Sequence, residues 1–140
     1  MFEKVLLAVD GSEHALRAAQ TAADLARAMK SKEFRIVVAY EAIPPYLGEP
    51  YMQSVIDDRR EATQAVLDNA VKAVGELPCE IHTEIIEASP AEAIIDVATT
   101  RNSSVIVMGS RGLGKLAGLL LGSTSQKVVS HAPCPVLIVR

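Results

Sequence analysis

One stretch near the carboxyl end of the chain constrains the fold most. Residues 105–108 form an apolar run typical of a buried strand, and residues 123–131 have the pattern of a helix. Between them lies a glycine-rich segment that begins with Gly109 and closes with Gly122. A strand, a glycine loop and a helix in this order are typical of parallel α/β sheets. The stretch therefore predicts a ligand site at the carboxyl end of a strand.

The chemistry of this segment favours an anion. The first backbone N–H groups of a helix have no partner within the helix, and the helix dipole places positive charge there. We expect Gly109 and Gly112 to adopt positive φ and to leave room for a ribose or phosphate, and Gly122 to stand just before the helix. Hydroxyl and cationic side chains accompany these glycines: Arg111, Lys115, Ser123 and Thr124.

Two familiar phosphate-binding motifs fit the segment only in part. Gly109 to Lys115 matches G-x-x-x-x-G-K, but Leu116 stands where a P-loop has the hydroxyl that holds magnesium. Residues 112–114 imitate a dinucleotide fingerprint, yet no acidic residue follows Asp96 to bind ribose hydroxyls. Both motifs are therefore rejected.

The rest of the chain alternates strand and helix patterns. Strands are expected at 4–9, 34–40, 79–87, 105–108 and 136–139, and helices at 15–29, 52–74, 89–100 and 123–131. Alternation predicts one α/β domain over residues 1–140, a doubly wound parallel sheet with helices on both faces. The alternating pattern of the third strand and the prolines before the last favour edge positions for both. Residues 41–50 form either a lid or an exposed connection.

Two helix starts carry cap signals. Asp10 and Gly11 form a turn before Ser12, which we expect to cap the first helix. Ser89, Pro90 and Glu92 have the spacing of a capping box at the third helix. Asp10 thus has one structural interpretation, as a turn residue beside Ser12, and one functional interpretation, as a ligand.

Charge and cysteine content exclude several classes of protein. The net charge of −3 gives no support for a nucleic-acid binder. The first 96 residues hold nine basic and 17 acidic residues, whereas the remainder holds five basic residues and no acid, as an anion site near the glycines would require. Two isolated cysteines argue for a reducing compartment, and neither a signal-peptide pattern nor a membrane-length apolar run is visible. A cytoplasmic protein without membrane association is expected.

The glycines of this segment follow a fixed spacing. Two residues separate the first glycine from the second, nine separate the second from the third, and a serine follows directly: Gly109, Gly112, Gly122 and Ser123. Together with residues 5–12 and 133–139, this spacing resembles the ATP-binding branch of the universal stress protein family, and the resemblance covers the whole chain. It implies the strand order 3-2-1-4-5. That order would place Asp10 and Gly109 on opposite sides of the point where the winding of the sheet reverses, which is where such folds bind ligands.

The resemblance also implies a set of binding residues. Asp10 would bind a ribose hydroxyl or a Mg²⁺ or Mn²⁺ ion held by the phosphates of ATP, and the backbone around Ala39 and Tyr40 would contact adenine. Ribose and phosphates would lie at Gly109, Gly112, Gly122, Ser123 and Thr124, with Arg111 as a neutralising side chain and Ser125 and Gln126 as weaker candidates. The complete predicted set is Ala8, Asp10, Ala39, Tyr40, Met108, Gly109, Arg111, Gly112, Gly122, Ser123 and Thr124.

The favoured function is an ATP-binding stress protein that acts as a nucleotide-responsive regulator or protector and forms a homodimer through its last strand. A slow ATPase or phosphotransferase is one alternative, although Asp10 is the only acid expected at the site. A non-nucleotide interaction module on the same fold is another. His14, His82 and His131 are too scattered to suggest a metal site.

Overall fold

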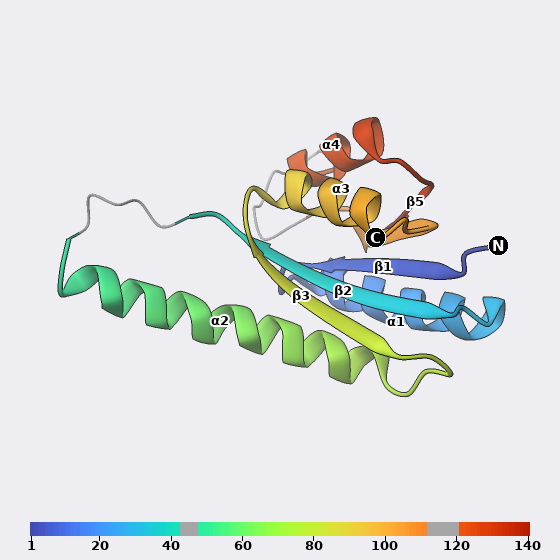
Figure 1. The fold of residues 1–140 in the computed structure, drawn as a ribbon, viewed down its shortest axis with the longest axis horizontal. Coiled ribbons are helices and arrows are strands. Elements are labelled where there is room, and N and C mark those ends of the chain that lie inside the picture. The colour runs from blue at the N-terminus through green and yellow to red at the C-terminus, as the bar shows by residue number, and fades with distance from the viewer. Residues whose placement is uncertain (43–47, 112–120) are drawn as a thin grey trace.

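The computed structural model of the chain describes residues 1–42, 48–111 and 121–140. Within them strands and helices alternate as predicted (Figure 1). The elements are β1 (Lys4–Val9), α1 (Glu13–Met29), β2 (Glu33–Tyr40), α2 (Tyr51–Val74), β3 (Ile81–Glu87), α3 (Pro90–Thr100), β4 (Val105–Gly109), α4 (Ser123–His131) and β5 (Val136–Val139). The largest difference from the expected bounds of a strand is at β3, which begins at Ile81 instead of Cys79.

The five strands form one parallel sheet in the order β3-β2-β1-β4-β5. The strand order implied by the family resemblance is therefore confirmed. The chain first builds outward from β1 to β2 and β3, and then returns to the other side of β1 to place β4 and β5. The winding reverses between β1 and β4, which are neighbours in the sheet through the pairs Val5 with Val105 and Leu7 with Val107.

Helices cover both faces of the sheet. Figure 1 shows α1 and α2 on one face and α3 and α4 on the other. The pleat divides β1 accordingly: Val5, Leu7 and Val9 join the core under α1 and α2, whereas Leu6 and Ala8 join the core under α3 and α4. Burial on both faces explains why the sequence of β1 is a continuous apolar run.

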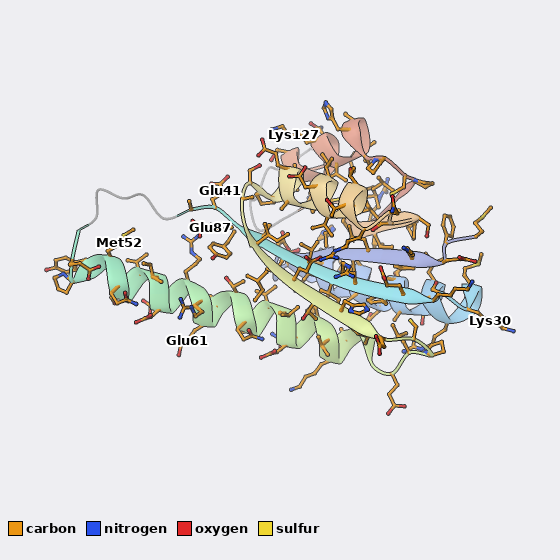
Figure 2. The ribbon with its side chains drawn as sticks, viewed as in Figure 1. Lys30, Glu41, Met52, Glu61, Glu87 and Lys127 are labelled. Atoms are coloured by element: carbon orange, nitrogen blue, oxygen red, sulfur yellow. The ribbon has the colours of Figure 1, made fainter. Side chains whose placement is uncertain are left out.

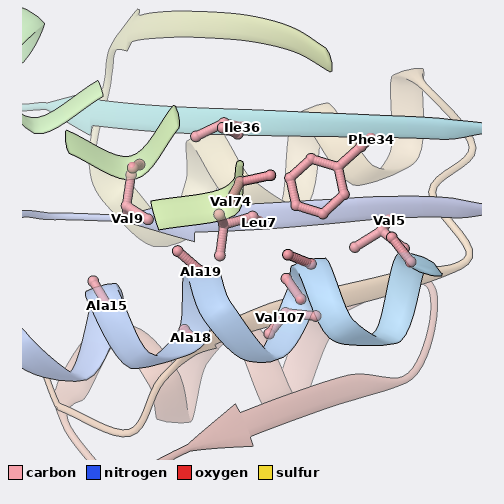
Figure 3. Close-up of a cluster of buried hydrophobic side chains, with 14 of the residues drawn as sticks. Val5, Leu7, Val9, Ala15, Ala18, Ala19, Phe34, Ile36, Val74 and Val107 are labelled. Carbon is pink, nitrogen blue, oxygen red and sulfur yellow. The ribbon is translucent and has the colours of Figure 1, made fainter. Parts of the chain in front are cut away.

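Alanines allow α1 to lie close to the sheet. Its buried residues are all alanines, among them Ala15, Ala18 and Ala19, and they belong to the same core as the larger side chains of Leu7 and Phe34 (Figure 3). Small side chains on the helix therefore meet large ones on the strands, as close packing of a helix on a sheet requires.

The two cap predictions have different outcomes. The Ser12 hydroxyl accepts a hydrogen bond from the Ala15 N–H at 3.2 Å, so the cap of α1 is confirmed. The capping box at α3 is wrong, because Ser89 makes no side-chain cap bond and its buried Oγ has no partner. Pro90 begins the helix with a fixed φ, and the Ala93 N–H bonds the Ser89 carbonyl at 3.0 Å, so the main chain starts α3 without the hydroxyl.

An ion pair fastens the edge strand β3 to β2. The Arg35 side chain is only 10% exposed, and its guanidinium lies 3.2 Å from a Glu84 carboxylate oxygen and 3.7 Å from one of Glu33. Arg101 approaches the second oxygen of Glu84 at 3.4 Å. Because a nearly buried charge is costly without a counter-charge, Glu84 makes the buried charged position of β2 compatible with the core.

The sheet ends in two different edges, as the strand patterns predicted. β3 and β5 are the outer strands, and each carries an exposed apolar side chain, Ile85 and Leu137. Figure 2 shows Glu41 and Glu87, at the ends of β2 and β3, on one side of the molecule and Lys30 on the opposite side. Among the described residues, no helix combines the length and apolarity needed to cross a membrane.

Replacing Glu84 with Gln should lower the free energy of unfolding by about 1–2 kcal/mol, because it leaves Arg35 with only the longer contact to Glu33. Urea unfolding measures the change. The matched control is Glu80→Gln, since the Glu80 side chain is 88% exposed and should change stability by less than about 0.5 kcal/mol. Equal stability of both variants would show that solvent, and not Glu84, compensates Arg35.

Candidate functional site

A pocket with about 530 Å³ of empty space, part of it open to solvent, lies at the carboxyl end of the sheet where the winding reverses. It lies on the face that α3 and α4 cover. Its apolar wall comes from the core under these two helices: Ala8, Val37, Ile94 and Met108. Polar groups from three different segments surround the remainder: Asp10, Ser12, Arg111, Thr124 and Ser125. Apolar walls with a few convergent polar groups are typical of a small-molecule site.

The pocket brings together most of the residues predicted from sequence. The predicted residues that line it are Ala8, Asp10, Ala39, Met108, Gly109, Arg111 and Thr124. Tyr40 instead lines a separate groove beside α2, and Ser123 lines a polar groove between α3 and α4 that shares Pro90 and Thr124 with the pocket. Gly122 lies next to both without lining either, and Gly112 is outside the described residues.

Asp10 fixes a turn and also lines the pocket. One carboxylate oxygen accepts a hydrogen bond from the Ser12 N–H at 2.9 Å, which fixes the turn between β1 and α1. The same side chain lines the pocket, and it is the only acidic side chain among the described lining residues. The turn therefore orients a carboxylate whose second oxygen remains available to a ligand.

The reason for glycine at position 109 differs from the expected one. Gly109 does not have a positive φ, so that expectation is wrong. A β-carbon at this position would lie 2.7 Å from the His14 β-carbon and 2.9 Å from the His14 carbonyl carbon. Glycine is needed here because the first turn of α1 lies directly on the end of β4.

The start of α4 is tied to the end of β4. Gly122 is the N-cap residue of α4, as predicted, and its N–H donates to the Ser110 carbonyl at 2.8 Å. The Ser125 hydroxyl lies 2.9 Å from the Gly109 carbonyl oxygen and 3.1 Å from that of Ser110. Among the described residues, no side chain caps α4. Ser125, a weaker candidate in the sequence, thus fixes the helix start beside the pocket.

Several residues at the site carry no sequence signal. Val37, Pro90 and Ile94 complete the apolar wall, but their types are those of any strand or helix start. His14 lies 2.9 Å, through its Nδ1, from the Oγ of Ser110, which is 2% exposed. The sequence analysis assigned no role to His14 beyond its being too far from the other histidines for a metal site. Because His14 and Ser110 are 96 positions apart, only the folded chain reveals their contact.

The other reactive groups do not form a centre. Burial raises the pKa of the Cys79 and Cys134 thiols, with a further increase at Cys79 from the nearby Glu33 carboxylate. Both cysteines are free and remain protonated near neutral pH, as structural cysteines do. In the part of the chain that the structure describes, no three His, Cys, Asp or Glu side chains are grouped to hold a metal ion.

The sheet order and the pocket at its reversal point define a doubly wound α/β protein with a candidate small-molecule site. A sequence model of the universal stress protein family matches residues 1–140. A universal stress protein of Thermus aquaticus is 46% identical over 140 residues, and the match covers all of both chains. The chain therefore belongs to the universal stress protein family.

Solved structures agree with this assignment. Universal stress protein UspA from Lactobacillus plantarum is 25% identical with a TM-score of 0.80, and the match covers 99% of this chain and 98% of that one. A universal stress protein solved in complex with cAMP is 26% identical with a TM-score of 0.67, and the match covers 99% and 97% of the two chains.

Replacing Gly109 with Ala should lower the free energy of unfolding by about 1–3 kcal/mol, because the new β-carbon has no space against His14. Chemical denaturation measures the loss. The control Ser103→Ala alters a turn residue at the opposite end of β4 and should have little effect. An unchanged stability of Gly109→Ala would mean that the first turn of α1 moves away from β4 at little cost.

Proposed function

We propose that this protein binds ATP in the pocket at the reversal point and acts as a nucleotide-responsive stress regulator or protector. The observation that carries the proposal is the convergence of Asp10 after β1, Ala39 near the end of β2 and Arg111 after β4 on one pocket. These positions are far apart in the sequence, and each is one that the family resemblance implies for nucleotide binding. The cAMP complex of a relative supports a nucleotide as the class of ligand.

The two halves of the pocket suit the two halves of a nucleotide. A purine base is flat and largely apolar, and Ala8, Val37 and Met108 offer an apolar wall with small side chains at its centre. Phosphates would lie toward Thr124 and the start of α4, where backbone N–H groups and the cationic Arg111 favour negative charge. The ligand would thus run from the sheet toward α4.

A divalent cation would accompany the phosphates. Mg²⁺ in nucleotide sites is commonly held by one or two carboxylates together with phosphate oxygens and water. Asp10 fits this requirement, since the hydrogen bond from Ser12 occupies one oxygen and orients the other. Mg²⁺ or Mn²⁺ bound there would neutralise charge on the phosphates. With one oxygen of Asp10 engaged by the turn and the other by the metal ion, no further acid among the described lining residues could activate water, so we favour binding over hydrolysis.

Calorimetric titration of nucleotide-free protein with ATP and Mg²⁺ should give a dissociation constant in the micromolar range, equivalent to about −8 kcal/mol. Gly122→Val should weaken ATP binding at least about tenfold, because its methyl groups would occupy the phosphate position at the start of α4. The backbone of Gly122, with φ of −73° and ψ of 169°, accepts a side chain without strain. The Gly122→Val replacement should weaken the binding of AMP less than the binding of ATP.

Lys72→Ala on the exposed side of α2 serves as the control and should bind ATP like the unaltered protein. Absence of heat with either nucleotide, confirmed by equilibrium dialysis, would contradict the proposal and favour an interaction module on the same fold. Equal ATP affinity of Gly122→Val and the unaltered protein would place the phosphates elsewhere. The cytoplasmic location expected from the sequence stays a prediction.

We also propose that two copies pair through β5. This strand lies at the edge of the sheet and is hydrogen-bonded to β4 on its other side. Leu137 on β5 and Val129 on the neighbouring α4 are exposed apolar residues. An apolar edge strand invites pairing with another chain, and a second copy would cover it.

Leu137→Lys should convert dimers to monomers in sedimentation equilibrium, because the pairing would bury an unpaired charge. The matched control is Ile85→Lys, which places the same charge on an equally exposed apolar position of the opposite edge strand, β3. This control should remain dimeric. A Leu137→Lys protein that stays dimeric would show that another surface is used.

A further inference from the structure

His14 uses both ring nitrogens at the edge of the pocket. Its Nδ1 lies 2.9 Å from the Ser110 Oγ, and its Nε2 lies 3.4 Å from an Nη atom of Arg111. Arg111 lines the pocket, whereas His14 itself does not. His14 therefore contacts the Arg111 guanidinium on one side and the buried Ser110 on the other.

The chemistry of arginine assigns the protonation state of this ring. A guanidinium has only donors, so the His14 Nε2 must accept the hydrogen bond with its lone pair. The ring is then neutral, its proton is on Nδ1, and Nδ1–H donates to the Ser110 hydroxyl oxygen. A neutral acceptor orients the guanidinium without cancelling its charge, which a carboxylate would do. Among the described residues, Arg111 forms no ion pair with a carboxylate.

The anchor of this arrangement is rigid. Ser110 is buried, its N–H donates to the Val139 carbonyl at 2.8 Å, and its own carbonyl accepts from Gly122 at 2.8 Å and from Ser125 at 3.1 Å. On the other side, the absent side chain of Gly109 lets the His14 backbone lie directly on β4. The ring of His14 is thus held by its own main chain and by a serine that cannot move independently.

We propose that His14 is a positioning residue that holds the Arg111 guanidinium at the pocket mouth, fully charged, for a phosphate group of the ligand. This inference rests on the proposed nucleotide function and specifies one further part of it. An arginine in solution samples many rotamers, and ordering one on binding costs affinity. Because His14 orders Arg111 before the ligand binds, it should raise the affinity for ligands that carry a phosphate. It should not affect the affinity for the base or the ribose.

Three replacements of His14 separate positioning from structural support. His14→Asn keeps a polar group near the Nδ1 position, toward Ser110, but is too short to reach Arg111. His14→Gln extends to the Nε2 position and can accept from Arg111, so it should restore most of the effect. His14→Ala removes both contacts. Calorimetry with ATP and with adenosine, both with Mg²⁺, measures the affinity, and thermal denaturation reports the stability of each variant.

We expect His14→Asn to weaken ATP binding roughly two- to tenfold, the range for losing the pre-ordering of one long side chain. Adenosine affinity should be unchanged. Arg111→Ala should weaken ATP binding on the order of tenfold by removing a charged donor, and adding His14→Asn to it should cause no further loss. His82→Ala, on the distant strand β3, is the control and should behave like the unaltered protein.

The proposal is overturned if His14→Asn binds ATP normally, if adenosine affinity falls equally, or if the loss persists in the Arg111→Ala background. These outcomes leave nucleotide binding itself intact in the unaltered protein. If the unaltered protein binds neither ATP nor adenosine, the proposed function fails, and the role of His14 fails with it. Failure of the His14 proposal can therefore be distinguished from failure of the proposed nucleotide binding.

Discussion

The structure depends on parallel strands that are buried on both faces. Such strands must satisfy their backbone groups through neighbours on either side and their side chains through helices above and below. β1 fulfils these conditions at the centre of the sheet, between β2 and β4, and sends alternate residues into two separate cores. Because the chain winds in opposite directions from β1, the ends of β1 and β4 face a space that no crossover covers. The pocket follows from the topology before any particular side chain is considered.

Sequence patterns predicted the elements well because their physical causes are local. Apolar runs gave the strands, alanine spacing gave α1, and a serine before the helix gave its cap. The third helix shows the limit of such reasoning: Ser89 and Glu92 have the spacing of a capping box, but the side-chain hydrogen bond of the cap is absent. Spacing indicates that a bond is possible, while the path of the backbone decides whether it forms.

At the site, the sequence predicted several of the residues that line the pocket, but not the physical reason for each residue type. The pocket contains Asp10, Ala39 and Arg111 as expected, yet Gly109 is a glycine because α1 touches β4, and not because of its backbone angles. His14 and Ser110 could not be paired from the sequence, since their contact depends on how helix and strand are docked. Ile94 and Val37 line the pocket through packing of α3 on the sheet, and residues of these types occur throughout the core. Side chains that act through tertiary contact leave no local pattern to detect.

The position of Ser110 has a consequence for how distant surfaces communicate. Its N–H holds the Val139 carbonyl at the end of the edge strand, while its neighbour Arg111 lines the pocket. If two copies pair through β5, as proposed above, a bound group that shifts this segment would change the free energy of pairing through the hydrogen bond between Ser110 and Val139. Thermodynamic linkage makes such an influence reciprocal, so contacts along the edge strand would change the affinity of the pocket by the same factor. Ser110 thus lies on a direct covalent and hydrogen-bonded connection between the pocket and the outer edge of the sheet.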